Sequence, residues 1–462
     1  MSRRVRGRRR GGSGKLILWL LLLLLIAGGV FFAYKSPIFE REKPQILTTN
    51  TISANTKTPI KFTIKDNSGL KSCKVVLSSD ETKIPIYNQK FLIKSKDKTV
   101  EVKLPKEVTN SKKDNWNIII TATDSSLWGF FMGNKSQKIA KLIIDNTPPQ
   151  ISTIASSQNI TKGGSAIVIY KIDDKNLKDT YIEISKNIKF KPIKYRKNGV
   201  YASLIVWPFN QDSFNPKIVA IDKANNKSEH SIQISKIDRE YKVSKIKASD
   251  KFINGKISQL AQQDPDYSNI SGKLDKFRAV NEKMREKNEN LIHKYTKSVT
   301  PFNKKWDIKP FKPLKGYKRV SDFGVKRYYY YKTPDNIIST SYHVGYDLAS
   351  VKHDNLYANS GKVVFAGYNG IYGNMPIIDH KFGLYTLYGH CSSILVEKNQ
   401  KIQHMQTIAK TGATGLALGD HVHFGVLIQG VEVLPLEWMK SKWIDTHINA
   451  VFKKADSILG YN

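Results

Sequence analysis

An uncharged and almost wholly apolar stretch at residues 16–34, LILWLLLLLLIAGGVFFAY, constrains the fold more than any other feature of the chain. As a helix, at 1.5 Å per residue, it would measure roughly 28 Å, close to the roughly 30 Å thickness of the hydrocarbon core of a bilayer. Positive charge is retained on the cytoplasmic side of such a segment, and basic residues precede it: Arg3, Arg4, Arg6, Arg8, Arg9, Arg10 and Lys15. We therefore expect a basic cytoplasmic tail at 1–15, one transmembrane helix at 16–34 in the inner (cytoplasmic) membrane, and a periplasmic or otherwise extracytoplasmic bulk.

A cleaved signal peptide is the alternative interpretation of this stretch. Its apolar region would be shorter, and a small-x-small cleavage site would follow it. The residues that follow the leucines, Phe31-Phe-Ala-Tyr-Lys-Ser-Pro37, form a poor site, which favours a retained anchor. Attraction to anionic membrane lipids explains the arginines beside a spanning segment, so no nucleic-acid partner is expected.

Short β-rich runs separated by polar turns fill residues 45–238. Examples are PIKFTIKD, NWNIIITATD, SAIVIYKI and PKIVAID. Runs of this length and spacing are typical of antiparallel sandwiches. A weak internal repeat supports two copies, since Ile120–Asp124 is followed by Asn134 and Val219–Asp222 is followed by Asn226. Two modules are predicted, at 45–148 and 149–238. They resemble bacterial immunoglobulin-like domains in pattern, and a spacer or a binding stalk are both open as their role.

The pattern changes to helical between residues 239 and 312. Ile270 to Lys297 is rich in lysine and glutamate, lacks proline and spaces its apolar residues helically, and Pro265 separates it from an earlier helix near 248–262. This segment is predicted to be a helical linker or a gate over a neighbouring site. A terminal helix is expected within 441–462.

Three polar clusters lie between residues 343 and 423. They are His343-x-x-x-Asp347 in SYHVGYDLA, His390 in LYGHCS, and His421-x-His423 in GDHVHFGV. In GDHVHFGV the histidines share one parity and Val422, Phe424 and Val426 share the other. A strand sends alternate side chains to opposite faces, so the apolar set can face a core while both imidazoles face a cleft.

Two imidazoles and one carboxylate suit zinc, and a catalytic zinc site leaves its fourth position for water. Residue types alone leave open that these are surface histidines and a turn aspartate. A resemblance favours the metal site. Residues from about 315 to 440 resemble the lysostaphin/LytM-type zinc metallopeptidases, which cut peptidoglycan cross-links. The matching segments, in order, are SDFGVKR (321–327), HVGYDLA (343–349), Leu356–Gly367, IIDHKFGLYTLYGH (377–390), Lys410–Gly415 and HVHFGV (421–426).

The resemblance implies an antiparallel-β peptidase domain at 313–440, with zinc bound by His343, Asp347 and His423. It also implies that His390 and His421 flank the metal-bound water and act in catalysis. Cys391 follows the central histidine, where relatives more often have an apolar residue, and we expect it to pack as a small buried side chain. An assisting tyrosine, as in some relatives, could be Tyr342 or one of Tyr328 to Tyr331.

The fold class expected is multidomain and mainly β: an N-terminal transmembrane helix, two immunoglobulin-like sandwiches, a helical linker and the LytM-type domain. The expected function is that of a membrane-anchored zinc endopeptidase hydrolysing peptide cross-links of peptidoglycan. Two alternatives are open: a non-catalytic activator or scaffold for another wall hydrolase, and a metallopeptidase that acts on protein substrates such as glycine-rich linkers. The formal charge of +36, from 75 Lys and Arg against 39 Asp and Glu, fits an acidic polymer as partner. Partners among wall-synthesis proteins or hydrolases are also possible.

Overall fold

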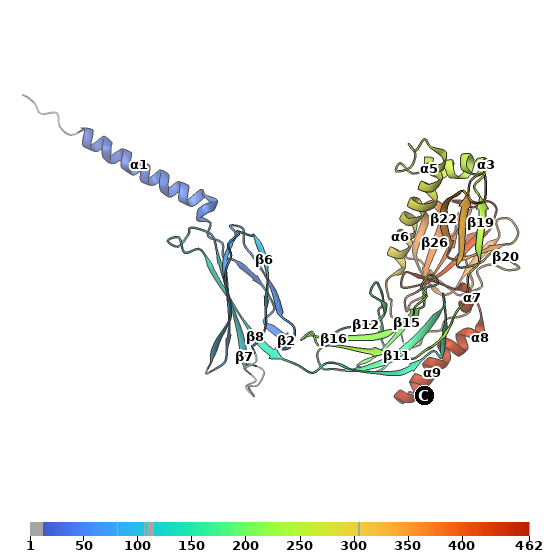
Figure 1. The fold of residues 1–462 in the computed structure, drawn as a ribbon, viewed down its shortest axis with the longest axis horizontal. Helices are drawn as coiled ribbons and strands as arrows, with labels where there is room; N and C mark the ends of the chain where they lie inside the picture. The colour runs from blue at the N-terminus through green and yellow to red at the C-terminus, as the bar shows by residue number, and fades with distance from the viewer. Residues whose placement is uncertain (1–12, 81, 106–107, 109–114, 304, 462) are drawn as a thin grey trace, which may run out of the picture. The chain divides into compact units, whose positions relative to one another are not determined.

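The computed structural model describes residues 13–80, 82–105, 108, 115–303 and 305–461. The chain divides into two compact units (Figure 1). One unit comprises Met1–Pro148 with Asp222–Asn226, and the other comprises Pro149–Ile221 with Lys227–Asn462. The arginines of the predicted basic tail lie outside the described residues.

The apolar stretch forms α1 (Ser13–Lys35), which is followed by the short η1 (Pro37–Phe39). The leucine side chains of α1 are exposed in the isolated chain. By length and composition this helix could cross a membrane, and a signal sequence near an N-terminus has the same properties. An anchor or a signal is therefore the role that its composition supports.

The remainder of the first unit is a β-sandwich. Its smaller sheet has the order β1-β3-β6: β1 (Gln45–Leu47), β3 (Ile60–Lys65), β6 (Asp97–Val102). Its larger sheet has the order β2-β8-β7-β4-β5: β2 (Thr51–Ala54), β8 (Lys135–Ile144), β7 (Trp116–Asp124), β4 (Leu70–Ser78), β5 (Lys83–Lys90). The strands alternate buried and exposed residues, and Ile64, Val75 and Ile118 meet in the core. Period-two alternation thus produces two one-sided sheets.

A second sandwich opens the second unit. One sheet has the order β14-β15-β11-β9: β14 (Ile193–Lys194), β15 (Val200–Val206), β11 (Ser165–Asp173), β9 (Gln150–Ser156). The other has the order β13-β12-β16-β17: β13 (Ile188–Phe190), β12 (Leu177–Ser185), β16 (Lys217–Asp222), β17 (Lys227–Ser231). A parallel pair joins β10 (Asn159–Thr161) to β18 (Ser235–Ile237).

The internal repeat corresponds to a shared turn structure. β7 ends at Asp124, whose carboxylate accepts hydrogen bonds from the backbone N–H of Asn134 (2.7 Å) and from its side-chain amide (2.8 Å). β16 ends at Asp222, whose carboxylate accepts the same two bonds from Asn226, at 2.8 and 2.7 Å. Both aspartates are buried. The amide of each asparagine thus satisfies a carboxylate that would otherwise be unpaired in the interior.

Two helices follow the second sandwich. The first is continuous through α3 (Asp250–Phe252), the π-helical η2 (Ile253–Ile257) and α4 (Ser258–Gln262), and the side chain of Ser249 caps its N-terminus. The second runs through α5 (Lys273–Arg278), η3 (Ala279–Met284) and α6 (Arg285–Thr296). The strand β19 (Val243–Lys247), which the helical prediction missed, precedes them. We call Val243–Thr296 the helical segment.

The C-terminal part is built on an eight-stranded sheet of order β20-β23-β31-β27-β26-β25-β29, with β32 beside β31. Its strands are β20 (Lys318–Ser321), β23 (Tyr346–Ala349), β31 (Val422–Ile428), β27 (Leu384–Gly389), β26 (Asn374–Asp379), β25 (Gly361–Tyr368), β29 (Lys401–Ile402) and β32 (Val431–Val433). A second sheet has the order β19-β21-β22, with β21 (Val325–Tyr330) and β22 (Ile337–His343). A third has the order β24-β30-β28, with β24 (Asn355–Ala358), β30 (Gln406–Lys410) and β28 (Ser393–Ile394).

The chain ends in α7 (Pro435–Trp438), α8 (Ser441–Ile444), η5 (Asp445–Asn449) and α9 (Ala450–Leu459). These helices pack on the second sandwich, where Arg196 forms an ion pair with Asp456 at 2.6 Å. Buried Trp306 and Trp438 belong to a core that continues from the sandwich into the eight-stranded sheet. The predicted fold class, mainly β with an N-terminal apolar helix, is confirmed, while the predicted domain boundaries stay predictions.

Candidate functional site

Three strands bring His343, Asp347 and His423 together. His343 is the last residue of β22, and Asp347 lies on β23. Asp347 is paired directly with His423 of the antiparallel β31. Directly paired residues project to the same face of a sheet, which explains why this carboxylate and this imidazole meet. His343 and Asp347 do not share a strand, because the chain leaves β22 after His343 and enters a different sheet at Tyr346.

The ligand-capable atoms of these residues converge on one point. His343 Nε2 lies 2.9 Å from Asp347 Oδ1 and 3.0 Å from His423 Nδ1. His423 Nδ1 lies 3.0 Å from the same carboxylate oxygen. His343 Nδ1 contacts the backbone carbonyl of Asp322 at 2.7 Å, so Nδ1 carries the proton and Nε2 presents a lone pair. Three lone-pair-bearing atoms facing one another are stabilised by a proton or a cation between them.

This donor set fits a zinc ion. Ligand atoms of a tetrahedral zinc site with bonds of about 2.0–2.1 Å lie roughly 3.3 Å apart, close to the three separations observed. The neighbouring backbone is adapted to the site, since a Cβ on Gly345 would lie 2.6 Å from His423 Nε2. A side chain at that position would displace the imidazole. His423, His343 and Asp347 could therefore hold a metal, with Gly345 making room for one of the ligands.

Burial and pairing set the protonation of the cluster. Burial opposes ionisation of Asp347, but the charges and hydrogen bonds of His343 and His423 hold the pKa of that carboxyl well below its usual range. Burial lowers the pKa of His423 to about 4, against the pull of Asp347. The cluster is thus an anionic carboxylate beside a neutral imidazole, the form in which both bind metal.

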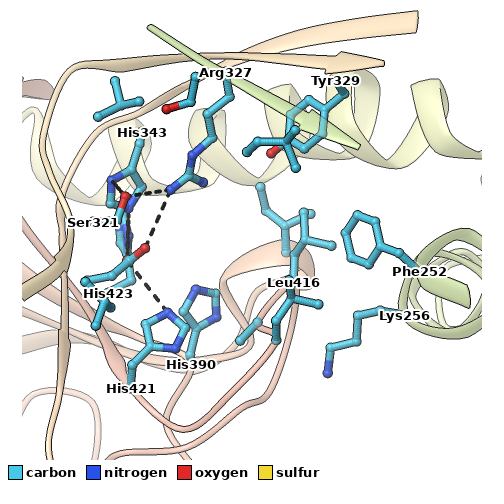
Figure 2. Close-up of a pocket in the computed structure, with 18 of the residues that line it drawn as sticks. Phe252, Lys256, Ser321, Arg327, Tyr329, His343, His390, Leu416, His421 and His423 are labelled. Carbon is cyan, nitrogen blue, oxygen red and sulfur yellow. Dashed lines mark hydrogen bonds and ion pairs between the residues drawn. The ribbon is translucent and has the colours of Figure 1, made fainter. Parts of the chain in front are cut away.

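His390 and His421 lie on the same side of this cluster (Figure 2). Their ring centroids are 4.8 Å apart, and His421 Nε2 lies 3.7 Å from Asp347 Oδ1. His390 Nδ1 contacts the carbonyl of Thr414 at 2.9 Å, and His421 Nδ1 contacts that of Gly419 at 2.8 Å. Both protons therefore lie on Nδ1, which leaves both Nε2 atoms as acceptors. Burial, aided by His421 and His423, lowers the pKa of His390 to about 3.

The backbone of His390 adopts a left-handed conformation with φ of +64°. Such a conformation is unfavourable for a residue with a Cβ and persists where the surroundings enforce it. Here the N–H of His390 donates to the carbonyl of Tyr372 at 2.7 Å. The ring of Tyr372 packs edge-on against His423, with centroids 5.6 Å apart. Tyr372 thus supports one histidine through its backbone and another through its ring.

Sequence reasoning missed Tyr372, and also Ser321 and Arg327. Arg327 donates to Ser321 Oγ at 2.9 Å and approaches Asp347 Oδ2 at 3.6 Å, while Ser321 Oγ lies 3.1 Å from His343 Nδ1. Both belong to the segment SDFGVKR, which the resemblance included without assigning roles. Tyr372 stands between two glycines in GIYG, a signal that marks a tight loop but no function.

The five histidine and aspartate side chains line a cleft of about 1130 Å³. We call the side of the cleft that carries these five residues the first wall. The second wall is formed by the helical segment, and its lining residues include Lys247, Lys251, Phe252, Lys256 and Arg285. Of the tyrosines proposed from sequence, Tyr329 and Tyr342 line the cleft. Cys391 is fully buried and its thiol donates to the carbonyl of Tyr388 at 3.1 Å, consistent with packing.

Residues 341–435 match peptidase family M23, so the C-terminal part of the chain contains a peptidase M23 domain and the resemblance stated above is confirmed. The chain is 36% identical over 100 residues to the peptidoglycan DD-endopeptidase ShyB of Vibrio cholerae, covering 21% of this chain and 23% of that protein. It is 34% identical over 101 residues to the murein hydrolase activator NlpD of Escherichia coli, covering 21% and 26% respectively. This chain thus spans about a quarter of the length of these curated relatives. The catalytic domain of lysostaphin from Staphylococcus simulans is 25% identical, with a TM-score of 0.23, covering 27% of this chain and 93% of that one.

Proposed function

We propose that this chain is a membrane-anchored zinc endopeptidase that hydrolyses peptide cross-links of peptidoglycan outside the cytoplasm. The observation that carries the proposal is the convergence of His343 Nε2, Asp347 Oδ1 and His423 Nδ1 within about 3 Å of one another in an open cleft. The M23 match over residues 341–435 supports the same reaction class.

His343, Asp347 and His423 would hold the zinc ion. Zinc bound there supplies Lewis acidity toward a peptide carbonyl and lowers the pKa of water. His390 and His421 would act on the proton of the attacking water and on the oxygen of the peptide carbonyl. With Nδ1 of each bonded to a carbonyl, an unprotonated Nε2 can take the proton of the attacking water and return it to the amine of the leaving peptide. The other imidazole can orient the water by accepting a hydrogen bond from it. Once an Nε2 has taken the proton, it can donate to the oxygen of the carbonyl under attack.

The remaining parts are proposed to place this site at the wall. α1 would anchor the chain in the inner membrane, with residues 1–15 in the cytoplasm beside anionic lipids. The sandwiches at 45–148 and 149–238 would act as a spacer. The helical part of 239–312 would border the cleft, residues 313–440 would form the peptidase domain, and 441–462 would brace it against the second sandwich.

A second candidate is an activator or scaffold for another wall hydrolase, and the match to NlpD favours it. The two candidates differ in whether the cleft itself performs chemistry. Five retained histidine and aspartate side chains in one cleft support the enzyme.

Digestion of purified cell walls by the full chain in detergent, followed by mass spectrometry of the products, tests the proposal. We expect new peptide termini that disappear when zinc is chelated and return when zinc is restored. A protein that releases no wall fragments with zinc bound, but accelerates an added wall hydrolase, would be an activator.

A further inference from the structure

Three lysines of the second wall have no carboxylate partner in the described part of the chain, whereas Arg285 lies near the carboxylate of Glu289. Lys247, Lys251 and Lys256 line it, and in the described part of the chain no Asp or Glu lies within ion-pair distance of any of the three. The lining carboxylates, Asp322 and Asp347, already have partners. Asp322 lies 2.8 Å from Arg319 and 3.1 Å from Lys242, and Asp347 is held by the histidines and Arg327.

Lys256 differs from the other two lysines because it is partly buried. Its Nζ donates to the backbone carbonyl of Ala413 at 2.9 Å, the one hydrogen bond recorded for this side chain among the described residues. An ammonium has three donors, so two remain for a ligand. Burial lowers the pKa of Lys256, which means that its charge lacks compensation from water or from an anion.

The position of Lys256 relates it to the reactive groups. Ala413 immediately precedes Thr414, whose carbonyl receives the Nδ1–H of His390. The ammonium therefore borders the same loop that holds His390. Figure 2 shows Phe252 and Lys256 extending from one helix toward Leu416, with His390 and His421 beyond. Apolar neighbours such as Phe252 and Leu416 reduce the local dielectric and strengthen any charge pairing formed there.

We propose that the second wall is a subsite for a carboxylate group of the peptide substrate, with Lys256 as its specificity-determining contact. The inference rests on the proposed function only in the choice of a peptide. A peptide lying in the cleft would expose its backbone to the first wall and a free carboxylate, from a side chain or a terminus, to Lys256. The wall-derived stem peptides carry such carboxylates. The contact would be a charge-assisted hydrogen bond, the stronger class of hydrogen bond in proteins.

The test compares two forms of one ligand. Binding of a cross-linked stem-peptide dimer, with its C-terminal carboxylate either free or converted to the amide, is measured by calorimetry on the full zinc-loaded chain in detergent. A His390→Ala background slows turnover by the expected factor of about 10²–10⁴, so that binding is complete before the ligand is cut. Lys256→Gln removes the charge and retains a donor for Ala413. Lys245→Gln, on the same strand as Lys247 but outside the cleft lining, is the matched control for net charge.

We expect Lys256→Gln to weaken binding of the free acid by about tenfold, leaving the amide unchanged, and Lys245→Gln to alter neither. Equal weakening of acid and amide, equal effects of both lysine substitutions, or no detectable binding of the acid would overturn the subsite. If zinc rather than Lys256 causes the preference for the free acid, that preference persists in Lys256→Gln. The substitution therefore distinguishes the two causes. Because binding is read before turnover, a chain that binds the acid through Lys256 but cuts no wall would refute only the proposed hydrolysis.

Discussion

The two walls of the cleft are built in different ways. The first wall takes most of its residues from within the M23 match at 341–435, on strands whose opposite faces are core: Val422 and Phe424 are fully buried beside His423. The imidazoles of His343, His390 and His421 are each fixed by an Nδ1 contact to a backbone carbonyl, and His343 and His423 contact Asp347, while the buried Nε2 of His423 has no partner among the described residues. The second wall precedes the M23 match, comes from helices and from β19, and presents lysines with few partners. Fixed groups suit bond-breaking, and uncommitted charges suit recognition of a ligand.

The largest expected effect is on the first wall. His423→Ala removes one of the three proposed zinc ligands, so we expect zinc affinity to fall by more than the roughly 10–100-fold typical of changes behind a ligand, and wall digestion to vanish. Elemental analysis of the dialysed protein measures this. His230→Ala, which removes an imidazole from β17, should leave zinc content unchanged. Full zinc occupancy in His423→Ala would refute the ligand assignment.

His390→Ala and His421→Ala should retain zinc and lose about 10²–10⁴-fold in turnover, the usual contribution of proton transfer and oxyanion stabilisation. Steady-state hydrolysis of soluble muropeptides at equal zinc occupancy provides the measurement. Near-normal turnover in either variant would remove that residue from the mechanism and reduce the first wall to a metal site.

Residues 239–312 were predicted to be a helical linker or a gate. A substitution of Asn288 in the helical segment distinguishes a gate from a fixed wall of the cleft. Asn288 Oδ1 accepts from the N–H of Ile371 at 2.9 Å, next to Tyr372, which supports His390. Asn288→Ala leaves that buried N–H unpaired, at a cost of about 1–3 kcal/mol. A displaced gate would raise muropeptide hydrolysis, whereas a displaced support would lower it. We expect a decrease, because leaving the sheet would also expose buried Phe277, Val280 and Met284.

Asn290→Ala is the matched control, since Asn290 lies on the exposed side of α6. An increase in hydrolysis specific to Asn288→Ala would establish gating and leave the enzyme assignment untouched.

The smallest effect on hydrolysis is expected for a substitution away from both walls, at Glu437, where the change is in the pH dependence of stability. Its carboxyl is buried and accepts from the N–H and hydroxyl of Ser165, at 2.9 and 3.1 Å. Burial raises its pKa to about 8, against the opposing effects of Ser165 and Arg239. The folded state therefore holds a proton that the unfolded state releases near pH 4.5, so the free energy of unfolding falls as pH rises from about 4.5 to 8.

Glu437→Gln keeps the carbonyl acceptor and has no proton to lose, so this part of the pH dependence should disappear. The thermal unfolding midpoint between pH 5 and 8.5 provides the measurement, with the exposed Glu397→Gln as the control. An unchanged slope in Glu437→Gln would mean that another group carries the dependence.

The sequence predicted the first wall far better than the second. Alternation around His423 and the spacing of His343 and Asp347 follow from strand geometry, which is local. The left-handed backbone of His390 and the support from Tyr372 depend on loops that meet only in three dimensions. The apolar stripe of the helical segment was visible, but which surface it covers was not. Lys256 is one lysine among many, and only its partial burial beside Ala413 distinguishes it.

The core shared by the second sandwich and the eight-stranded sheet has a mechanical consequence. Trp306 and Trp438 lie within it, and α9 is fastened to the sandwich by the ion pair of Arg196 with Asp456. Tension applied to the chain at residue 149 would pass from the second sandwich into the eight-stranded sheet through packed side chains, and not through a flexible linker. In single-molecule stretching, residues 149–461 should extend in one rupture event, because neither part can yield while the other keeps its core.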